Sequence, residues 1–162
     1  MGNEVPRKVY KVNINFISKI ALFDRMAPGD LKLLTKFMKG VGYRAGDIVC
    51  REGEKGEHVY FIVKGIMEII KEGLDGKNVV LTSLRKGRSI GEMAIIDKSP
   101  RSATLRAQTD VMLLALSKDK FELLLKEYPQ IGIKILKSLA KLLSMNLRKT
   151  SSRLADYMSP LV

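Results

Sequence analysis

Residues 91–107, GEMAIIDKSPRSATLRA, decide how this sequence is interpreted. A Gly-Glu pair is followed by a short apolar run, and Pro-Arg-Ser then leads into small and branched residues that alternate as in a strand. The stretch places one carboxylate, Glu92, and one guanidinium, Arg101, on either side of a tight apolar turn. Such a pair can form a plain ion pair at the surface, or it can hold a ligand.

The residue types in this stretch suit a ribose phosphate. If residues 91–96 form a helical turn, its first backbone N–H groups have no intrahelical partner and can bind an anion. Arg101 can pair with the same phosphate oxygens in a two-pronged geometry, and Ser102 adds a hydroxyl donor. Glu92 would repel a phosphate, so it needs a hydroxyl group to accept from, and a ribose 2′-OH supplies one. The alternative is an Arg101–Glu92 surface ion pair with no ligand.

Length and composition predict one cytoplasmic domain. The 162 residues are enough to bury a core, and 46% of them are hydrophobic. No apolar run reaches the roughly 18 residues that span a bilayer, and the N-terminal segment lacks the apolar core of a secretion signal. The single cysteine, Cys50, and the single histidine, His58, do not support a structural zinc, an iron–sulfur cluster or a haem. We therefore expect no metal and no haem.

The charge balance favours anionic partners. The chain has 29 Lys and Arg against 17 Asp and Glu, a formal net charge of +12. Part of this charge lies in a segment without acids, in Lys134, Lys137, Lys141, Arg148, Lys149 and Arg153. Without a groove-reading motif, this segment could bind nucleic acid only through phosphates, so we expect no sequence-specific DNA binding. A solvated helix face rich in lysine is the simpler interpretation.

The hydrophobic pattern changes twice along the chain. Residues 13–39 are predicted to be helical. Residues 40–116 consist of short branched and aromatic runs between glycine-containing turns, with a tight hairpin signal, LDGK, at 74–77. From Ser117, a predicted N-cap, the pattern is helical again, with a break at Pro129. The predicted fold is mainly β with flanking helices: an antiparallel β-barrel of the double-stranded β-helix or jelly-roll type, N-terminal helices and a long C-terminal helix.

The last helical segment carries a heptad pattern. Its members recur at alternating steps of four and three residues: Leu136, Ala140, Leu143, Leu147, Thr150, Leu154, Tyr157 and Leu161. A pattern of this length is typical of a coiled coil, whereas a helix packed within its own chain is the alternative. We therefore divide the chain into an N-terminal arm (1–12), a β-barrel domain with flanking helices (13–128) and a C-terminal dimerisation helix (129–162), and expect a homodimer through residues 129–160.

The opening stretch resembles the phosphate-binding cassette of the cyclic nucleotide-binding domain family, in which Gly-Glu, a short helix and Pro-Arg-Ser/Thr/Ala-Ala hold the nucleotide. Residues 45–70, AGDIVCREGEKGEHVYFIVKGIMEII, are similar to the family's glycine-punctuated strands. Residues 21–26, ALFDRM, resemble its N-terminal helical entry. Residues 147–154, LRKTSSRL, resemble the dimer helix of bacterial catabolite activator proteins, also called cAMP receptor proteins. The resemblance covers about residues 15–160.

The resemblance implies a sensor for cAMP or cGMP that binds its ligand in the cassette and signals through the C-terminal helix. It implies these ligand-binding residues: Gly91, Glu92, Met93, Ala94, Arg101, Ser102, Ile69, Leu81, Leu84, Thr150 and Ser151. Glu92 would accept from the ribose 2′-OH, while Arg101 and Ser102 would bind the cyclic phosphate. The hydroxyls of Thr150 and Ser151 would reach the base, the second across the dimer. The Ser102 hydroxyl could also serve a guanine amino group, so cAMP and cGMP both stay open.

The sequence departs from the catabolite activator proteins at its end, because those proteins continue into a helix-turn-helix and this chain stops at Val162. We expect either a free-standing sensor that acts on an unknown downstream protein or the effector half of a transcription regulator. A further alternative is a dimeric protein-interaction module of the same fold that has lost ligand binding. No second carboxylate accompanies Glu92, and there is no Ser-His-Asp set or Walker loop, so we do not expect an enzyme.

Overall fold

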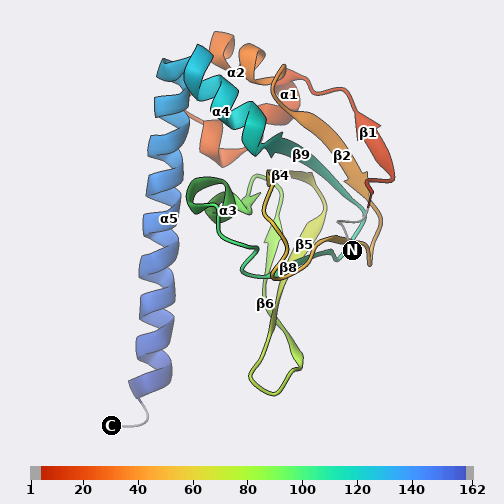
Figure 1. Ribbon diagram of the computed structural model, residues 1–162, viewed down its shortest axis with the longest axis vertical. Coiled ribbons are helices and arrows are strands. Elements are labelled where there is room, and N and C mark those ends of the chain that lie inside the picture. The colour runs from red at the N-terminus through yellow and green to blue at the C-terminus, as the bar shows by residue number, and fades with distance from the viewer. Residues whose placement is uncertain (1–4, 160–162) are drawn as a thin grey trace.

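Two antiparallel β-sheets face each other in the structure, a computed structural model that describes residues 5–159 (Figure 1). The first sheet has the strand order β1-β2-β9-β4-β7 and the second has β3-β8-β5-β6. The strands are β1 (Lys8–Tyr10), β2 (Lys39–Tyr43), β3 (Ile48–Cys50), β4 (His58–Lys64), β5 (Ile66–Glu72), β6 (Asn78–Arg85), β7 (Ser89–Ile90), β8 (Thr104–Ala107) and β9 (Val111–Ser117). The predicted fold class is confirmed, although the barrel consists of two separate sheets rather than one closed ladder.

Helices precede, interrupt and follow the strands. They are α1 (Ile14–Ile17), the 3₁₀ helix η1 (Ala21–Phe23), α2 (Pro28–Leu34), α3 (Glu92–Asp97), α4 (Lys118–Glu127) and α5 (Pro129–Met158). Pro129 occupies the first turn of α5, where its missing N–H costs no intrahelical hydrogen bond. The side chain of Ser117 accepts from the amide of Lys120, so the predicted N-cap of α4 is confirmed.

Strand β4 is buried on both faces, which explains its unbroken apolar run. Side chains alternate across a strand, so Val59 and Phe61 face the helices, where they join a core with Leu124 of α4. Tyr60 and Ile62 point the other way, into the core between the two sheets. Two residues of this strand, His58 and Tyr60, also contact Arg101 of the site described below.

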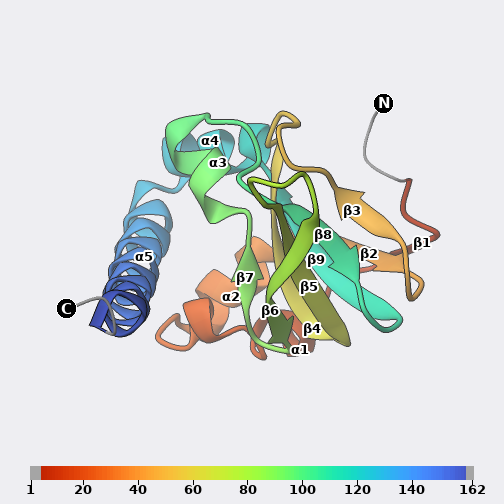
Figure 2. The same cartoon turned by 90° about the horizontal axis from the view of Figure 1, so that it is seen from below.

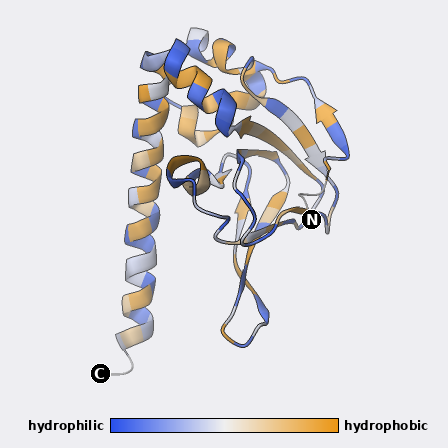
Figure 3. Cartoon of the chain, in the orientation of Figure 1, coloured by the Kyte–Doolittle hydropathy of each residue, from blue (hydrophilic) through white to orange (hydrophobic). Residues whose placement is uncertain are grey.

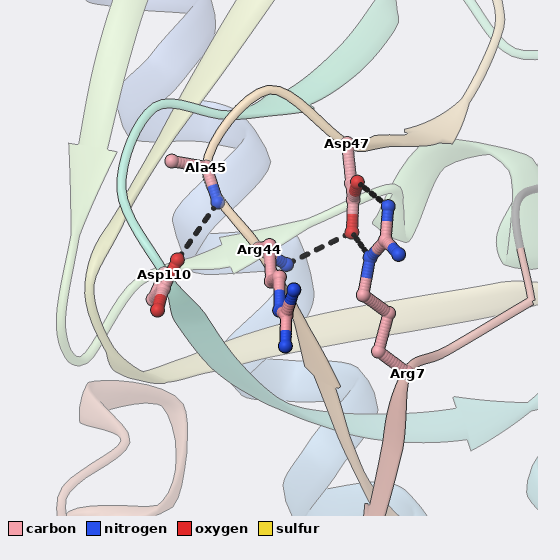
Figure 4. Close-up of polar contacts among 5 residues, drawn as sticks. All are labelled: Arg7, Arg44, Ala45, Asp47 and Asp110. Carbon is pink, nitrogen blue, oxygen red and sulfur yellow. Dashed lines mark hydrogen bonds and ion pairs between the residues drawn. The ribbon is translucent and has the colours of Figure 1, made fainter.

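The N-terminal arm is fastened to the first sheet, where β1 pairs with β2 (Figure 4). Arg7 donates from Nε and Nη2 to the Asp47 carboxylate over 2.6 and 2.7 Å, and the amide of Arg44 donates to the same group over 2.9 Å. Asp47 is 6% exposed, and the hydrogen bonds from Arg7 lower its pKa to about 2. Residues 1–4 of the predicted arm lie outside the described residues.

Helix α5 runs along one side of the molecule, with α3 between it and the strands (Figures 1 and 2). Its first turns are packed, because Ile131, Ile135 and Leu139 are buried. Leu147 and Tyr157 further along the predicted heptad are 68% and 81% exposed, and apolar bands recur down the helix (Figure 3). Leu161, the last predicted heptad position, is not among the described residues. Between residues 5 and 159, no helix combines the length and apolar character needed to cross a membrane.

Candidate functional site

A cavity of about 630 Å³, here called the cassette cavity, lies between the second sheet, α3 and α5. The structure brings together at this cavity all but one of the residues that the sequence singled out: Ile69, Leu81, Leu84, Gly91, Glu92, Met93, Ala94, Arg101, Ser102 and Thr150. The exception is Ser151, which follows Thr150 on α5 but is not part of the cavity lining and is exposed. Residues from β5, from the loop after α3 and from α5 therefore converge on one space.

Two glycines allow the backbone around α3 to pack closely. Gly91 precedes the helix with φ of 85°, a left-handed conformation that favours glycine. A Cβ atom at Gly91 would overlap the guanidinium of Arg101, and one at Gly56 would overlap the side chain of Ala94. The predicted helical turn after Gly91 is confirmed, and its position against Arg101 depends on the absence of both side chains.

Arg101 is held in place by its backbone and by its side chain. Its amide donates to the carbonyl of Glu54 over 2.7 Å, and its carbonyl accepts from the amide of Gly53 over 2.8 Å. The guanidinium donates from Nη1 to the Gly91 carbonyl over 3.3 Å and from Nη2 to the His58 carbonyl over 2.5 Å. Arg101 is only 5% exposed. The loop before β4 thus fixes the backbone of Arg101, and the carbonyls of Gly91 and His58 fix the direction of its side chain.

The remaining contacts of Arg101 leave one donor without a partner. The Tyr60 ring lies 5.7 Å from the guanidinium carbon, within the range of a cation–π interaction. The Nε atom of Arg101 is buried and has no hydrogen-bond partner within residues 5–159. A buried donor without a partner costs free energy, so the site as it stands favours an incoming acceptor.

Glu92 is the second buried charged group of the cavity. It is 8% exposed, and its Oε2 atom has no hydrogen-bond partner among the described residues. Burial raises the pKa of the carboxyl above its ordinary value, and the nearby charge of Arg101 opposes that shift. Both residues belong to the described part of the chain, and no ion pair joins them. The alternative interpretation, a surface ion pair, is therefore wrong, because the two groups are buried and separate.

The loop between α3 and β8 is tied to the second sheet. The Lys71 ammonium donates to the carbonyl of Ser102 over 2.6 Å and to the carboxylate of Glu52 over 2.7 Å. The hydroxyl of Thr104 accepts from the amide of Glu52 over 2.9 Å. Ser102 is therefore positioned at the cavity by contacts with β5. Within residues 5–159, no group of three or more His, Cys, Asp or Glu could hold a metal ion.

Sequence reasoning missed several residues that line the cassette cavity. Among them are Arg88, just before β7, Ser89 of β7, and Leu142, Asn146, Lys149 and Arg153 of α5. The α5 residues recur at steps of three and four, which places them on one helix face together with Thr150. That spacing could be read from the sequence, but the direction in which this face points depends on how α5 crosses the sheets.

Comparison with known proteins connects this geometry to a family. The sequence model of the cyclic nucleotide-binding domain family matches residues 41–128. The chain is 29% identical to a CRP-like cAMP-activated global transcriptional regulator of Mycobacterium tuberculosis over 140 residues, 86% of this chain. It is 33% identical to a cyclic nucleotide-gated potassium channel of Mesorhizobium japonicum over 129 residues, 80% of this chain.

A similar fold is known for a cyclic nucleotide-binding domain from Methylobacillus flagellatus, with a TM-score of 0.78 and 27% identity over 92% of this chain and 82% of that one. The chain spans 61% of the length of the mycobacterial regulator and 34% of the channel. The match to the family covers β2 to α4 and includes the whole α3 segment with Glu92 and Arg101. The family prediction is confirmed: this chain belongs to the cyclic nucleotide-binding domain family, a regulatory ligand-binding module.

Proposed function

We propose that this domain binds a 3′,5′-cyclic mononucleotide, cAMP or cGMP, in the cassette cavity and signals through α5. One observation carries the proposal: Glu92 and Arg101 are both buried, both line the same cavity, and each has a polar atom without a partner. An anionic ligand that also carries a hydroxyl group would satisfy both residues. A ribose with a cyclic phosphate has these two groups on adjacent atoms.

The phosphate would lie between the first turn of α3 and Arg101. The backbone N–H groups at the start of α3 have no intrahelical partner, and the guanidinium offers donors in a fixed planar arrangement. In this structure the guanidinium donates to the carbonyls of Gly91 and His58. A phosphate would add a charged acceptor for Arg101 and a partner for its Nε atom. The Ser102 hydroxyl would contribute a further donor.

The ribose and the base would occupy the rest of the cavity. Glu92 would accept from the 2′-OH, and this hydrogen bond favours the charged form of the carboxyl. Leu81 is 54% exposed, and together with Ile69 and Leu84 it would be covered by the base. The Thr150 hydroxyl of α5 would meet the far side of the base. The ligand would therefore join α5 to the second sheet.

We also propose that α5 pairs with α5 of a second copy. Three apolar members of the predicted heptad are largely uncovered in a single chain, since Leu147, Leu154 and Tyr157 are each more than half exposed. Covering such side chains removes apolar surface from water, which is the main driving force for helix pairing. In a pair, Ser151 would approach the cavity of the other copy, which would account for its position outside its own. Dimer geometry and ligand binding would then be linked, and a downstream protein would read the result.

Two relatives support a cyclic nucleotide as the ligand, because the mycobacterial regulator is described as cAMP-activated and the Mesorhizobium channel as cyclic nucleotide-gated. Isothermal titration calorimetry with cAMP, cGMP and 5′-AMP tests the proposal. We expect saturable binding of at least one cyclic nucleotide at one site per chain, and at least about tenfold weaker binding of 5′-AMP, whose open phosphate does not fit the same donors. Absence of heat with both cyclic nucleotides, or equal affinity for 5′-AMP, would contradict it.

A further inference from the structure

A second cavity, of about 610 Å³, shares no described lining residue with the cassette cavity. Its floor is the rim of the core between the sheets, formed by Val41, Tyr43, Tyr60 and Ala115. Phe37 and Met38, which precede β2, add further apolar surface. We call this space the arm cavity, because the N-terminal arm forms one of its walls.

Among the described residues, all charged side chains that line the arm cavity are basic. Lys36, Lys39 and Lys120 line it, and their side chains are exposed. None of these lysines makes an ion pair with the described acidic residues. Burial lowers the pKa of His58, which also lines the cavity, and so disfavours the charged form of its imidazole. Three unpaired cations around an apolar floor create a local preference for a negative charge.

The arm cavity is a built feature of the fold. Val5 and Pro6 line it, and the next residue, Arg7, is fixed by its two hydrogen bonds to the buried Asp47 (Figure 4). The opposite wall belongs to β4, where the rings of His58 and Tyr60 stack at 5.9 Å. That wall also supports the cassette cavity, since the His58 carbonyl accepts from Arg101.

We propose that the arm cavity is a second ligand site, and that its ligand is a small amphipathic anion. The apolar body would lie on the floor between Val41 and Tyr60. A single carboxylate, sulfonate or phosphate would face Lys36, Lys39 and Lys120. The volume lies within the range of small-molecule sites, which are typically apolar with a few polar groups at fixed positions. The ligand would contact His58 and Tyr60, which also contact Arg101.

Two fluorescent probes that differ by one sulfonate test the charge requirement: 8-anilinonaphthalene-1-sulfonate and its uncharged counterpart N-phenyl-1-naphthylamine. We expect the ligand-free protein to bind the sulfonate at one site per chain. The double variant Lys39→Glu/Lys120→Glu should weaken sulfonate binding at least about tenfold and change binding of the neutral probe less than about twofold. Lys64→Glu/Lys86→Glu is the matched control, because both lysines are exposed, line neither cavity and carry the same charge change. This control should bind both probes as the wild type does.

Methionine methyl signals locate the probe. Met38 lines the arm cavity and Met93 lines the cassette cavity, so each reports on one site in a ¹³C-methyl-methionine NMR spectrum. Met38→Leu and Met93→Leu assign the two signals, and the dispersion of the spectrum shows that each charge variant is folded. The sulfonate should shift the Met38 signal and leave the Met93 signal in place. A shift of Met93 alone, the same affinity in the lysine-reversed variant, or no saturable binding would overturn the proposal.

Discussion

The guanidinium of Arg101 lies so close to Gly91 that a Cβ atom at residue 91 would overlap its Nη1 atom, which also donates to the Gly91 carbonyl over 3.3 Å. Gly91 therefore does two things at once. It adopts the left-handed conformation that starts α3, and it leaves room for the buried arginine beside that turn. Gly91 is thus needed both for the position of Arg101 and for the turn that starts α3.

Gly91→Ala should disrupt both features. The left-handed conformation costs a non-glycine residue roughly 1–3 kcal/mol of stability, and the methyl group would displace the guanidinium. We expect a loss of cyclic nucleotide affinity of at least about tenfold, because Arg101 would no longer face the phosphate in the same way. Calorimetry and denaturant unfolding would measure the two effects.

Gly46→Ala is the matched control for this prediction. Gly46 also has a positive φ, of 91°, but a Cβ atom there would meet nothing within 4 Å. This variant should lose stability for the same conformational reason and bind the nucleotide like the wild type. Wild-type binding in Gly91→Ala would show that the close approach to Arg101 has no role in ligand binding.

Glu92 should make the domain selective for the ribose hydroxyl. A buried carboxylate that loses its donor is left without a partner, so a 2′-deoxy cyclic nucleotide should bind the wild type more weakly by about 1–3 kcal/mol. In Glu92→Ala this difference should shrink, because the partner of the hydroxyl is gone. Calorimetry with matched ribose and 2′-deoxyribose ligands measures the gap. Equal binding of the two ligands by the wild type would remove the ribose role from Glu92.

The same carboxyl should lower the stability of the ligand-free protein at neutral pH. Burial raises the pKa of Glu92 above its ordinary value of 4.5, so folding favours the protonated form. Its favourable contribution is complete below pH 4.5 and is lost as the pH rises through the raised value. Glu92→Gln should therefore be more stable than the wild type at pH 7, and the difference should disappear near pH 4. If Glu92→Gln were less stable than the wild type at pH 7, the claim that the buried carboxyl destabilises the ligand-free protein would be wrong.

Asp47 should show the opposite dependence on pH. The hydrogen bonds from Arg7 lower its pKa from 3.8 to about 2, so its stabilising effect is complete above pH 3.8 and is lost as the pH falls toward 2. Asp47→Asn should unfold more easily than the wild type at pH 6, and the two should converge near pH 2. Denaturant unfolding across this range measures the difference, with the exposed Asp24→Asn as control. A constant difference at all pH values would exclude the ionised pair as its source.

Thr150 and Ser151 should separate ligand binding from dimer formation. Thr150 lines the cassette cavity and falls on the predicted heptad, so Thr150→Leu should strengthen pairing of α5 in the absence of ligand and weaken nucleotide affinity. Ser151→Ala lies beside the heptad and should weaken binding without strengthening the dimer. Light scattering read beside calorimetry distinguishes the two effects. A protein that stays monomeric with and without ligand would refute the proposed link.

Much of the fold could be predicted because its local patterns agree with its tertiary contacts. The hairpin at 74–77 is formed as expected, with the amide of Gly73 donating to the carbonyl of Lys77 over 2.8 Å. Strand β2 was not predicted, because its sequence KGVGY contains two glycines. The structure gives the reason: Cβ atoms at Gly40 and Gly42 would lie 2.8 and 2.9 Å from Tyr10 side-chain atoms. That close approach comes from a distant segment and leaves no local signal.

The candidate site also contains residues that could be predicted from the sequence and residues that could not. Glu92 and Arg101 could be identified because both lie in one short stretch whose residue types already suit a ribose phosphate. Asn146, Lys149 and Arg153 could not, because they reach the cavity only through the path of α5 across the second sheet. The arm cavity could not be predicted from the sequence either. Lys39 at the start of β2 and Lys120 near the start of α4 line the same cavity only in the folded chain.

Calorimetry of Arg101 variants against cAMP and cGMP tests the central claim most directly. Arg101→Leu should weaken binding by about 2–4 kcal/mol, because the desolvated phosphate loses its charged partner. Arg101→Lys should recover only part of this, since a single ammonium cannot form the two-pronged contact. Arg25→Leu, an exposed arginine outside both cavities, should bind like the wild type. If Arg101→Leu bound cyclic nucleotide as tightly as Arg25→Leu, the cassette cavity would not be the phosphate site and the account would be wrong.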